Sequence, residues 1–138
     1  MSPQTIEDEV SLELPFEPAS AKVARSQLVS WLAGLGVAAD RVEDARLVIS
    51  ELVGNAVRHA RPLDPGVMLV GWRERDDGLE LEVSDGGAPT VPRQRNAGAD
   101  AVEGRGLSIV AALSERWWIE SAASKNTVHA RLPLPRRT

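Results

Sequence analysis

Three polar residues, Glu51, Asn55 and His59, recur every fourth position beside a stripe of apolar residues. At that spacing they line up along one side of a helix. A carboxylate in this row can orient or deprotonate a hydroxyl group, and an amide oxygen one turn later can ligate Mg²⁺, a hard ion that prefers oxygen ligands. A solvated helix face carries the same residue types, so the row needs support from the rest of the chain.

Two glycine-containing segments supply that support. Asp85, Gly86 and Gly87 follow a predicted strand, and residues 104–106 precede a predicted helix. Glycines let backbone N–H groups approach phosphate oxygens, a helix N-terminus favours an anion, and Asp85 can accept a hydrogen bond from an exocyclic amine. Each segment alone is typical of a turn or a loop-to-helix junction, so only the ordered set indicates a site.

The elements that must position these residues follow from the spacing of apolar residues. Alternation over residues 10–14 predicts a short strand, and Ser20 is placed to cap a first helix. Asp40, followed three residues later by Glu43, resembles a capping box that opens a long helix through about His59.

The second half of the chain predicts two hairpins and a short helix. Runs 67–73 and 79–84, joined by the turn residues 76–78, predict the first hairpin. The helix and two further strands are expected at 107–113, 117–121 and 128–132. The order of elements predicts an α+β fold, a two-layer sandwich of one mixed sheet with helices on one face.

The 138 residues suit a single domain with one core. Residues 1–9 have the composition of a frayed polar arm, and 134–138 that of a tail. Gly, Ala, Pro and Arg dominate the stretch from Asp85 to Gly106 without a sustained period, which predicts a functional loop at about 86–105.

Composition excludes several kinds of protein. No Cys is present, which excludes a disulfide scaffold, a Cys-ligated zinc site and a thiol nucleophile. The net charge of −4 argues against nucleic-acid binding. An acidic start and no long apolar run predict a cytoplasmic protein without membrane contact. His59 and His129 stand too far apart in the chain for a metal pair, so we expect satisfied structural histidines.

The ordered motifs resemble the GHKL ATPase superfamily, and within it the anti-sigma-factor serine/threonine kinases. The resemblance runs from the strand at Val10 to the strand at Val128. It implies the Bergerat fold, which is the histidine-kinase-like ATPase fold, with ATP and Mg²⁺ as cofactors. Glu51 and Asn55 match the family's N box, which implies a general base and a Mg²⁺ ligand. Asp85 matches the first glycine box, together with Gly87, and would recognise adenine.

The second glycine box is matched by Gly104 and Gly106, which implies phosphate contacts at the end of an ATP lid. Arg105 lies inside that box and Leu107 directly follows it, so both join the expected cofactor-binding residues. Thr127 stands where the family has a Gly-Thr pair beside the adenine, which implies that it helps to hold a water next to the adenine-binding carboxylate.

The chain departs from the family pattern at three positions. Pro89 replaces the second glycine of the first box, and Ala101 replaces a glycine ahead of the second box. Asn126 replaces the glycine of the Gly-Thr pair, and asparagine is the best substitute where φ is positive. None of these changes removes a charged or metal-binding group.

The resemblance implies an ATP-dependent protein serine/threonine kinase that acts as an anti-sigma factor. The alternative is an ATP-gated switch that sequesters a transcription regulator without transferring phosphate, and a histidine-kinase catalytic domain comes third. The implied partners are a sigma factor, an antagonist of the small STAS type and a second copy of the chain. Phosphoserine on a partner would separate the first two hypotheses.

Overall fold

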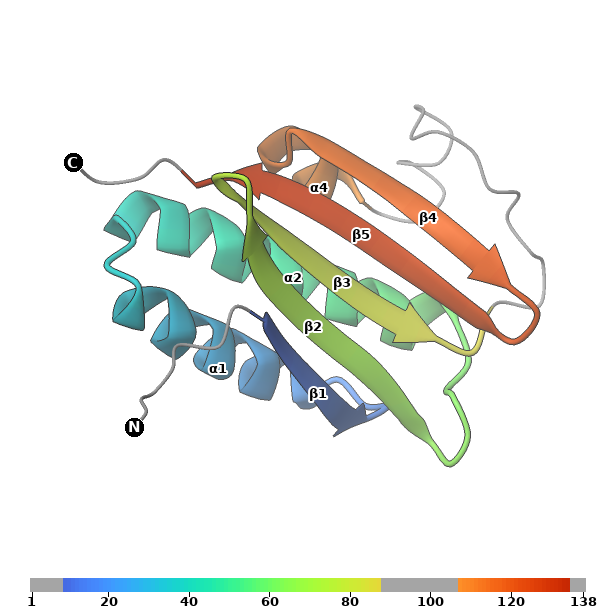
Figure 1. Cartoon of the computed structure of the whole chain (residues 1–138). Coiled ribbons are helices and arrows are strands. Elements are labelled where there is room, and N and C mark those ends of the chain that lie inside the picture. The colour runs from blue at the N-terminus through green and yellow to red at the C-terminus, as the bar shows by residue number, and fades with distance from the viewer. Residues whose placement is uncertain (1–8, 88–106, 135–138) are drawn as a thin grey trace.

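The computed structural model describes residues 9–87 and 107–134. Figure 1 shows one twisted sheet with the helices of this region on one of its faces. The elements follow the chain in the order β1 (Glu9–Pro15), α1 (Ser20–Gly34), α2 (Ala39–His59), β2 (Val67–Arg75), β3 (Gly78–Asp85), α4 (Ser108–Leu113), β4 (Arg116–Ala122) and β5 (Lys125–Pro133). The predicted α+β, two-layer architecture is confirmed.

The sheet has five strands in the order β1-β2-β3-β5-β4, and every neighbouring pair is antiparallel. The expected mixed sheet is therefore wrong. Two helices separate β1 from β2, so the chain reverses direction three times and β2 runs antiparallel to β1. β4 does run in the same direction as β3, but β5 lies between them and pairs with both.

The first helix starts differently from the sequence prediction. Its N-cap residue is Ala19, which makes no side-chain cap hydrogen bond, and Ser20 is the first helical residue. The Ser20 hydroxyl donates instead to the Pro15 carbonyl oxygen at 2.6 Å. The serine therefore ties the helix to the end of β1 rather than capping its N–H groups.

The capping box expected for the second helix is also wrong. α2 begins one residue before Asp40, with Ala38 as an N-cap that makes no side-chain hydrogen bond. Glu43 accepts two hydrogen bonds from the Arg46 guanidinium, at 3.0 and 2.6 Å, and this pairing lowers the pKa of Glu43. The predicted end of the helix at His59 is confirmed.

The apolar residues form one core between the helices and the sheet. α1 and α2 each bury a stripe of apolar residues, and alternate residues of the strands meet them from the sheet. Trp117 faces this core, whereas Trp118 faces away from it, as the alternation of a strand requires. Leu134, expected in the tail, is buried, and its N–H donates to the Asp77 carbonyl at 2.9 Å.

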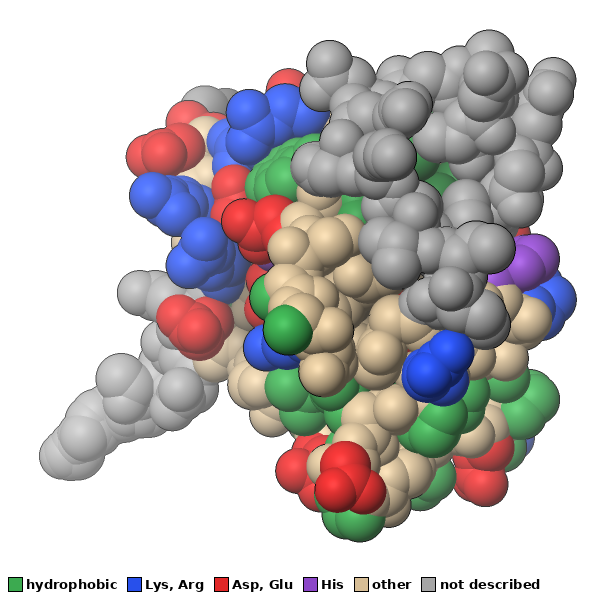
Figure 2. All heavy atoms as spheres, turned by 90° about the vertical axis from the view of Figure 1, so that its right-hand side faces the viewer, with side chains coloured by type: hydrophobic (Ala, Val, Ile, Leu, Met, Phe, Trp, Pro, Cys, Tyr) green, Lys and Arg blue, Asp and Glu red, His purple; other side chains and the backbone are tan. Residues whose placement is uncertain are grey.

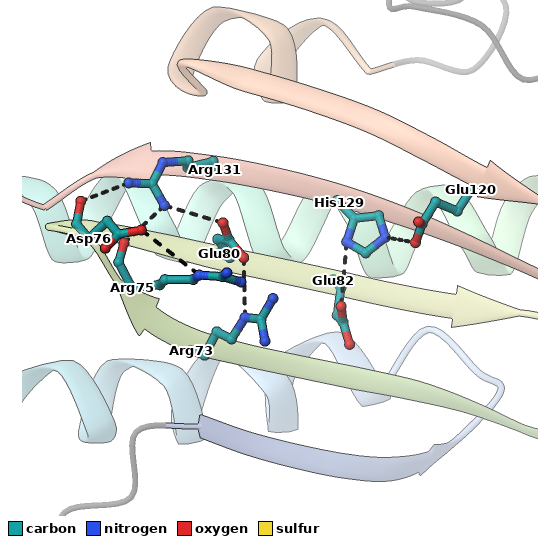
Figure 3. Close-up of polar contacts among 8 residues, drawn as sticks. All are labelled: Arg73, Arg75, Asp76, Glu80, Glu82, Glu120, His129 and Arg131. Carbon is teal, nitrogen blue, oxygen red and sulfur yellow. Dashed lines mark hydrogen bonds and ion pairs between the residues drawn. The ribbon is translucent and has the colours of Figure 1, made fainter.

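The predicted turn between β2 and β3 is confirmed. Asp76 and Asp77 both have positive φ, 52° and 59°, the conformation that a tight two-residue hairpin turn needs. Arg131 of β5 braces this turn from the helix-free face of the sheet, where it donates to the Asp76 carbonyl at 2.9 Å and to the Glu80 carboxylate at 3.2 Å (Figure 3).

The same face holds His129 in a fully partnered position. Its ring nitrogens lie 3.4 Å from a Glu82 oxygen and 2.7 Å from a Glu120 oxygen, one carboxylate on either side (Figure 3). The ring also stacks on Trp118, with centroids 4.8 Å apart. The expectation of a satisfied structural histidine is confirmed here, whereas His59 is exposed at the last residue of α2.

None of the helices within residues 9–87 and 107–134 is both long enough and apolar enough to cross a lipid bilayer.

Candidate nucleotide site

The described candidate residues gather toward one end of the molecule. The last turns of α2, the end of β3 and the start of β5 all lie at the right-hand end in Figure 1. Viewed from that side, tan atoms, which are backbone and uncharged polar side chains, make up much of the visible described surface (Figure 2). Exposed backbone and small polar groups are the kind of surface that can approach a ligand closely.

The row of polar residues on α2 is not a uniformly solvated face. Asn55 is buried, with 1% of its surface exposed, Glu51 is partly exposed and His59 is exposed. A step of four residues advances about 40° beyond a full helical turn. The row therefore drifts across the helix, with Asn55 toward the core and the other two residues on either side of it.

The Glu51 carboxylate is held by a cation from the next turns of the same helix. Arg58 Nη2 lies 3.4 Å from Glu51 Oε2. The Arg58 guanidinium lies over Gly54, because a Cβ atom added to Gly54 would be 3.0 Å from Arg58 Nη1. Glu51 keeps 24% of its side-chain surface exposed, so its carboxylate is oriented and still accessible. Sequence reasoning missed Arg58.

Asp85 ends β3 and is almost fully buried, with 1% exposed. Its Oδ1 accepts a hydrogen bond from the Gly87 N–H at 2.8 Å, which closes a tight turn directly after the strand. Gly87 has a φ of +97°, which favours glycine at this position. The glycine of the predicted first box is therefore explained by backbone conformation.

The segment after β3 is also joined to the segment after α2. The Gly86 N–H donates to the Arg61 carbonyl at 2.8 Å, and the Arg61 N–H donates to the Gly87 carbonyl at 2.9 Å. These two bonds fix the end of the helix that carries Glu51 and Asn55 to the end of the strand that carries the buried carboxylate. No sequence pattern predicts this link, because it involves backbone atoms.

Gly86 has no room for a side chain, since an added Cβ would collide with the Pro62 carbonyl oxygen. We expect Gly86→Ala to lower the free energy of unfolding by about 1–3 kcal/mol, the usual cost of overpacking. Urea unfolding followed by circular dichroism measures this change. Gly34→Ala is the matched control, because nothing lies within 4 Å of its added Cβ. An equal loss in both variants would contradict the assigned contact.

The structure does not bring Thr127 beside Asp85. Thr127 pairs with Ser84 across β3 and β5, and their hydroxyl oxygens are 2.8 Å apart. Adjacent residues of a strand point to opposite faces, so this pair lies on the helix-free face and Asp85 on the helix face. The residue directly opposite Asp85 is Asn126.

The expectation that Asn126 adopts a positive φ is also wrong. Among the described residues other than glycine, positive φ occurs only at Asp76 and Asp77. Asn126 lies inside β5 as a regular ladder residue, paired on its two sides with Asp85 and Ser121. Strand pairing, which needs extended backbone, determines its conformation.

Several expected site residues fall outside the described parts of the chain. They are Gly104, Arg105 and Gly106 of the second glycine box, together with Pro89, Ala101 and most of the predicted lid. Leu107 is described, and its side chain is fully buried in the core. Any contact from Leu107 to a nucleotide would therefore come from its backbone N–H.

The donor atoms on α2 fit a metal that is shared with a ligand. In residues 9–87 and 107–134 no group of three or more His, Asp or Glu side chains converges to hold an ion. Asn55 offers an oxygen ligand, which Mg²⁺ prefers, and Mg²⁺ is commonly bound through one or two protein oxygens plus substrate phosphates and water. The residues therefore fit Mg²⁺ carried with a nucleotide.

Comparison with known proteins gives a consistent result. Residues 14–132 match the model of the histidine kinase-like ATPase domain. A serine-protein kinase RsbW of Listeria monocytogenes is 32% identical over 84 residues, which are 60% of this chain and 54% of that protein. The RsbW of Oceanobacillus iheyensis is 28% identical over 81 residues, 58% of this chain and 51% of that protein. The chain thus spans about half the length of these curated relatives.

The fold also matches a solved structure. A crystal structure of the RsbU and RsbW domains of a Mycobacterium tuberculosis protein superposes on 95% of this chain and 34% of that one, with a TM-score of 0.70. The two sequences are 23% identical, so this likeness concerns the fold.

Proposed function

Because this chain belongs to the histidine kinase-like ATPase domain family, we propose that it is an anti-sigma-factor-type serine/threonine kinase. It binds Mg·ATP and phosphorylates a small regulatory partner protein. The observation that carries this proposal is the link between two elements: α2 bears Glu51 and Asn55, and the Arg61 bonds tie its end to the segment after Asp85. The names of the relatives, serine-protein kinase, support the same activity.

Nucleotide binding is divided between the two elements. Asp85 accepts a hydrogen bond from the exocyclic amine of adenine, and Gly87 gives the backbone the tight turn beside it. Asn55 supplies an oxygen ligand to Mg²⁺, which when bound neutralises part of the phosphate charge. Gly104, Arg105, Gly106 and the Leu107 N–H contribute the phosphate contacts.

Glu51 acts on the partner rather than on the nucleotide. Its carboxylate accepts the proton of a partner serine or threonine hydroxyl, whose oxygen bonds to the γ-phosphorus while the bond to the β–γ bridging oxygen breaks. The products are a phosphorylated partner and ADP. Arg58 orients the carboxylate while one quarter of its side-chain surface stays exposed.

A second candidate is an ATP-gated switch that sequesters a transcription regulator without phosphoryl transfer. The contact that favours it is the ion pair between Arg58 and Glu51, because it engages the carboxylate that proton transfer needs. In both functions the chain binds a sigma factor or an antagonist of the STAS type. It also pairs with a second copy of itself.

The two functions are separated by the covalent state of the partner. The chain is mixed with Mg·ATP and with candidate STAS-type proteins or sigma factors from the same organism, and each partner is analysed by intact-mass spectrometry. A partner that gains one phosphate on serine or threonine supports the kinase. A partner that is retained by the chain in ATP and never gains phosphate supports the switch.

We expect Asn55→Ala to weaken the binding of Mg·ATP by about tenfold, the equivalent of one lost ligand or hydrogen bond. Titration calorimetry in the presence of Mg²⁺ measures the loss, and the same titration in EDTA should show little difference from the wild type. Asn55→Asp keeps an oxygen ligand in a side chain of equal size and should retain the Mg²⁺ dependence. A tenfold loss that persists in EDTA would contradict a role in metal binding.

A further inference from the structure

We propose that Asn126, the second residue of β5, contacts the nucleotide base in the position expected for Thr127. The inference rests on the proposed function, since it needs a nucleotide bound at Asp85. It assigns a base-specificity role to a residue that the motif comparison treated as a replaced glycine.

The register of β3 and β5 places Asn126 and Asp85 side by side. They are direct partners in an antiparallel pair, so their side chains project from the same face of the sheet. On β3 the helix-facing row runs Leu81, Val83 and then Asp85. On β5 it runs Ala130, Val128 and then Asn126. Both apolar rows thus end in a polar residue at the same edge of the core.

Asn126 is largely enclosed, with 5% of its surface exposed. Its amide is not among the fully enclosed unpaired polar atoms within residues 9–87 and 107–134, which are Trp72 Nε1 and Ser114 Oγ. The amide therefore keeps some contact with solvent at the end of the core. An amide in this position, beside a buried carboxylate, can be reached by a ligand.

Thr127 is less suited to that role on two counts. It lies on the helix-free face, and its hydroxyl is already hydrogen-bonded to Ser84 at 2.8 Å. A base that contacts Asp85 on the helix face cannot reach a side chain on the other side of the sheet without passing through the strand. Thr127 and Asn126 are adjacent in β5, and adjacent side chains of a strand lie on opposite faces of the sheet.

The chemistry of the pair matches an adenine edge. A carboxylate only accepts hydrogen bonds, whereas an amide both donates and accepts. Adenine presents an exocyclic amine that donates, next to ring nitrogens that accept. Asp85 accepts from the amine, and the Asn126 NH₂ group donates to the adjacent ring nitrogen N1, which carries a hydrogen in guanine and hypoxanthine and cannot accept. Guanine and hypoxanthine carry a carbonyl in place of the amine, and its oxygen would face the Asp85 carboxylate.

The test compares two neighbouring substitutions, Asn126→Ala and Thr127→Val, with ADP and IDP as probes in titration calorimetry. IDP differs from ADP in carrying the carbonyl where ADP has the amine. We expect Asn126→Ala to bind ADP about tenfold more weakly and to keep the part of the preference for ADP over IDP that the Asp85 carboxylate supplies, whereas Thr127→Val stays within about threefold of the wild type. Thermal unfolding confirms that each variant is folded at the titration temperature.

Asn126→Thr is a third variant, because it returns a donor to the same face and should recover part of the ADP affinity. If Asp85→Asn abolishes ADP binding while Asn126→Ala binds like the wild type, the inference is overturned and the proposed function stands. A larger loss in Thr127→Val than in Asn126→Ala also overturns it. Failure of the folded wild-type chain to bind ADP overturns both.

Discussion

Glu51→Gln is expected to reduce phosphoryl transfer to a partner protein by about 10²- to 10⁴-fold, the range that general-base catalysis contributes. Glutamine has the same size and still offers an oxygen to the Arg58 guanidinium, which lies 3.4 Å from Glu51 Oε2 in the wild type. It cannot accept the hydroxyl proton. The rate of phosphate incorporation into the partner, measured under single-turnover conditions, gives the effect.

The affinity for Mg·ATP should stay within about threefold of the wild type in Glu51→Gln, because the residue acts on the partner hydroxyl. Arg58→Gln is the matched control: it releases the carboxylate from its ion pair and leaves the proton acceptor in place, so transfer should persist. Normal phosphorylation of a genuine partner by Glu51→Gln would show that Glu51 is not the base.

Asp85→Asn is expected to weaken the binding of Mg·ATP and Mg·ADP alike by about 100-fold. Asn can still accept the Gly87 N–H that Asp85 Oδ1 accepts at 2.8 Å, so the turn after β3 is preserved. Where the carboxylate would accept the adenine amine, the substitution places a second donor, and two facing donors leave a buried polar group unpaired.

The Asp85→Asn effect can be measured as ligand-induced stabilisation. A ligand that binds only the folded state raises the unfolding midpoint in proportion to the logarithm of its concentration over Kd. ADP should raise the midpoint of the wild type and of Asp40→Asn, an exposed carboxylate-to-amide control, and should leave that of Asp85→Asn nearly unchanged. An equal shift in all three proteins would remove Asp85 from the site.

Local patterns predicted the elements well, and pairing between distant segments explains what they missed. The Asp76-Asp77-Gly78 turn and the alternation in β3 are encoded within a few residues, and both are confirmed. The pairing of β3 with β5 joins strands that are far apart in the chain, and no local pattern shows it. α1 and α2 each begin earlier than predicted. Two of the side chains expected at their starts have other partners: Ser20 donates to the Pro15 carbonyl, and Glu43 accepts from Arg46.

For the site, the sequence identified the residue types but not the faces on which they lie. The burial of Asn55 and Asp85 agrees with the roles expected for them, yet those roles remain predictions. Thr127 and Asn126 are adjacent, and only the register with β3 shows which of them stands across from Asp85. The Arg61 bonds escaped prediction because they join backbone groups, whose partners depend on the fold.

The most direct test of the whole proposal is isothermal titration of the purified wild-type chain with ATP, with and without Mg²⁺. The structure and the family together predict saturable binding at one site per chain, strengthened by Mg²⁺. A chain that is folded by circular dichroism and shows no binding of ATP in either condition would contradict the claim that α2 and the end of β3 form a nucleotide site.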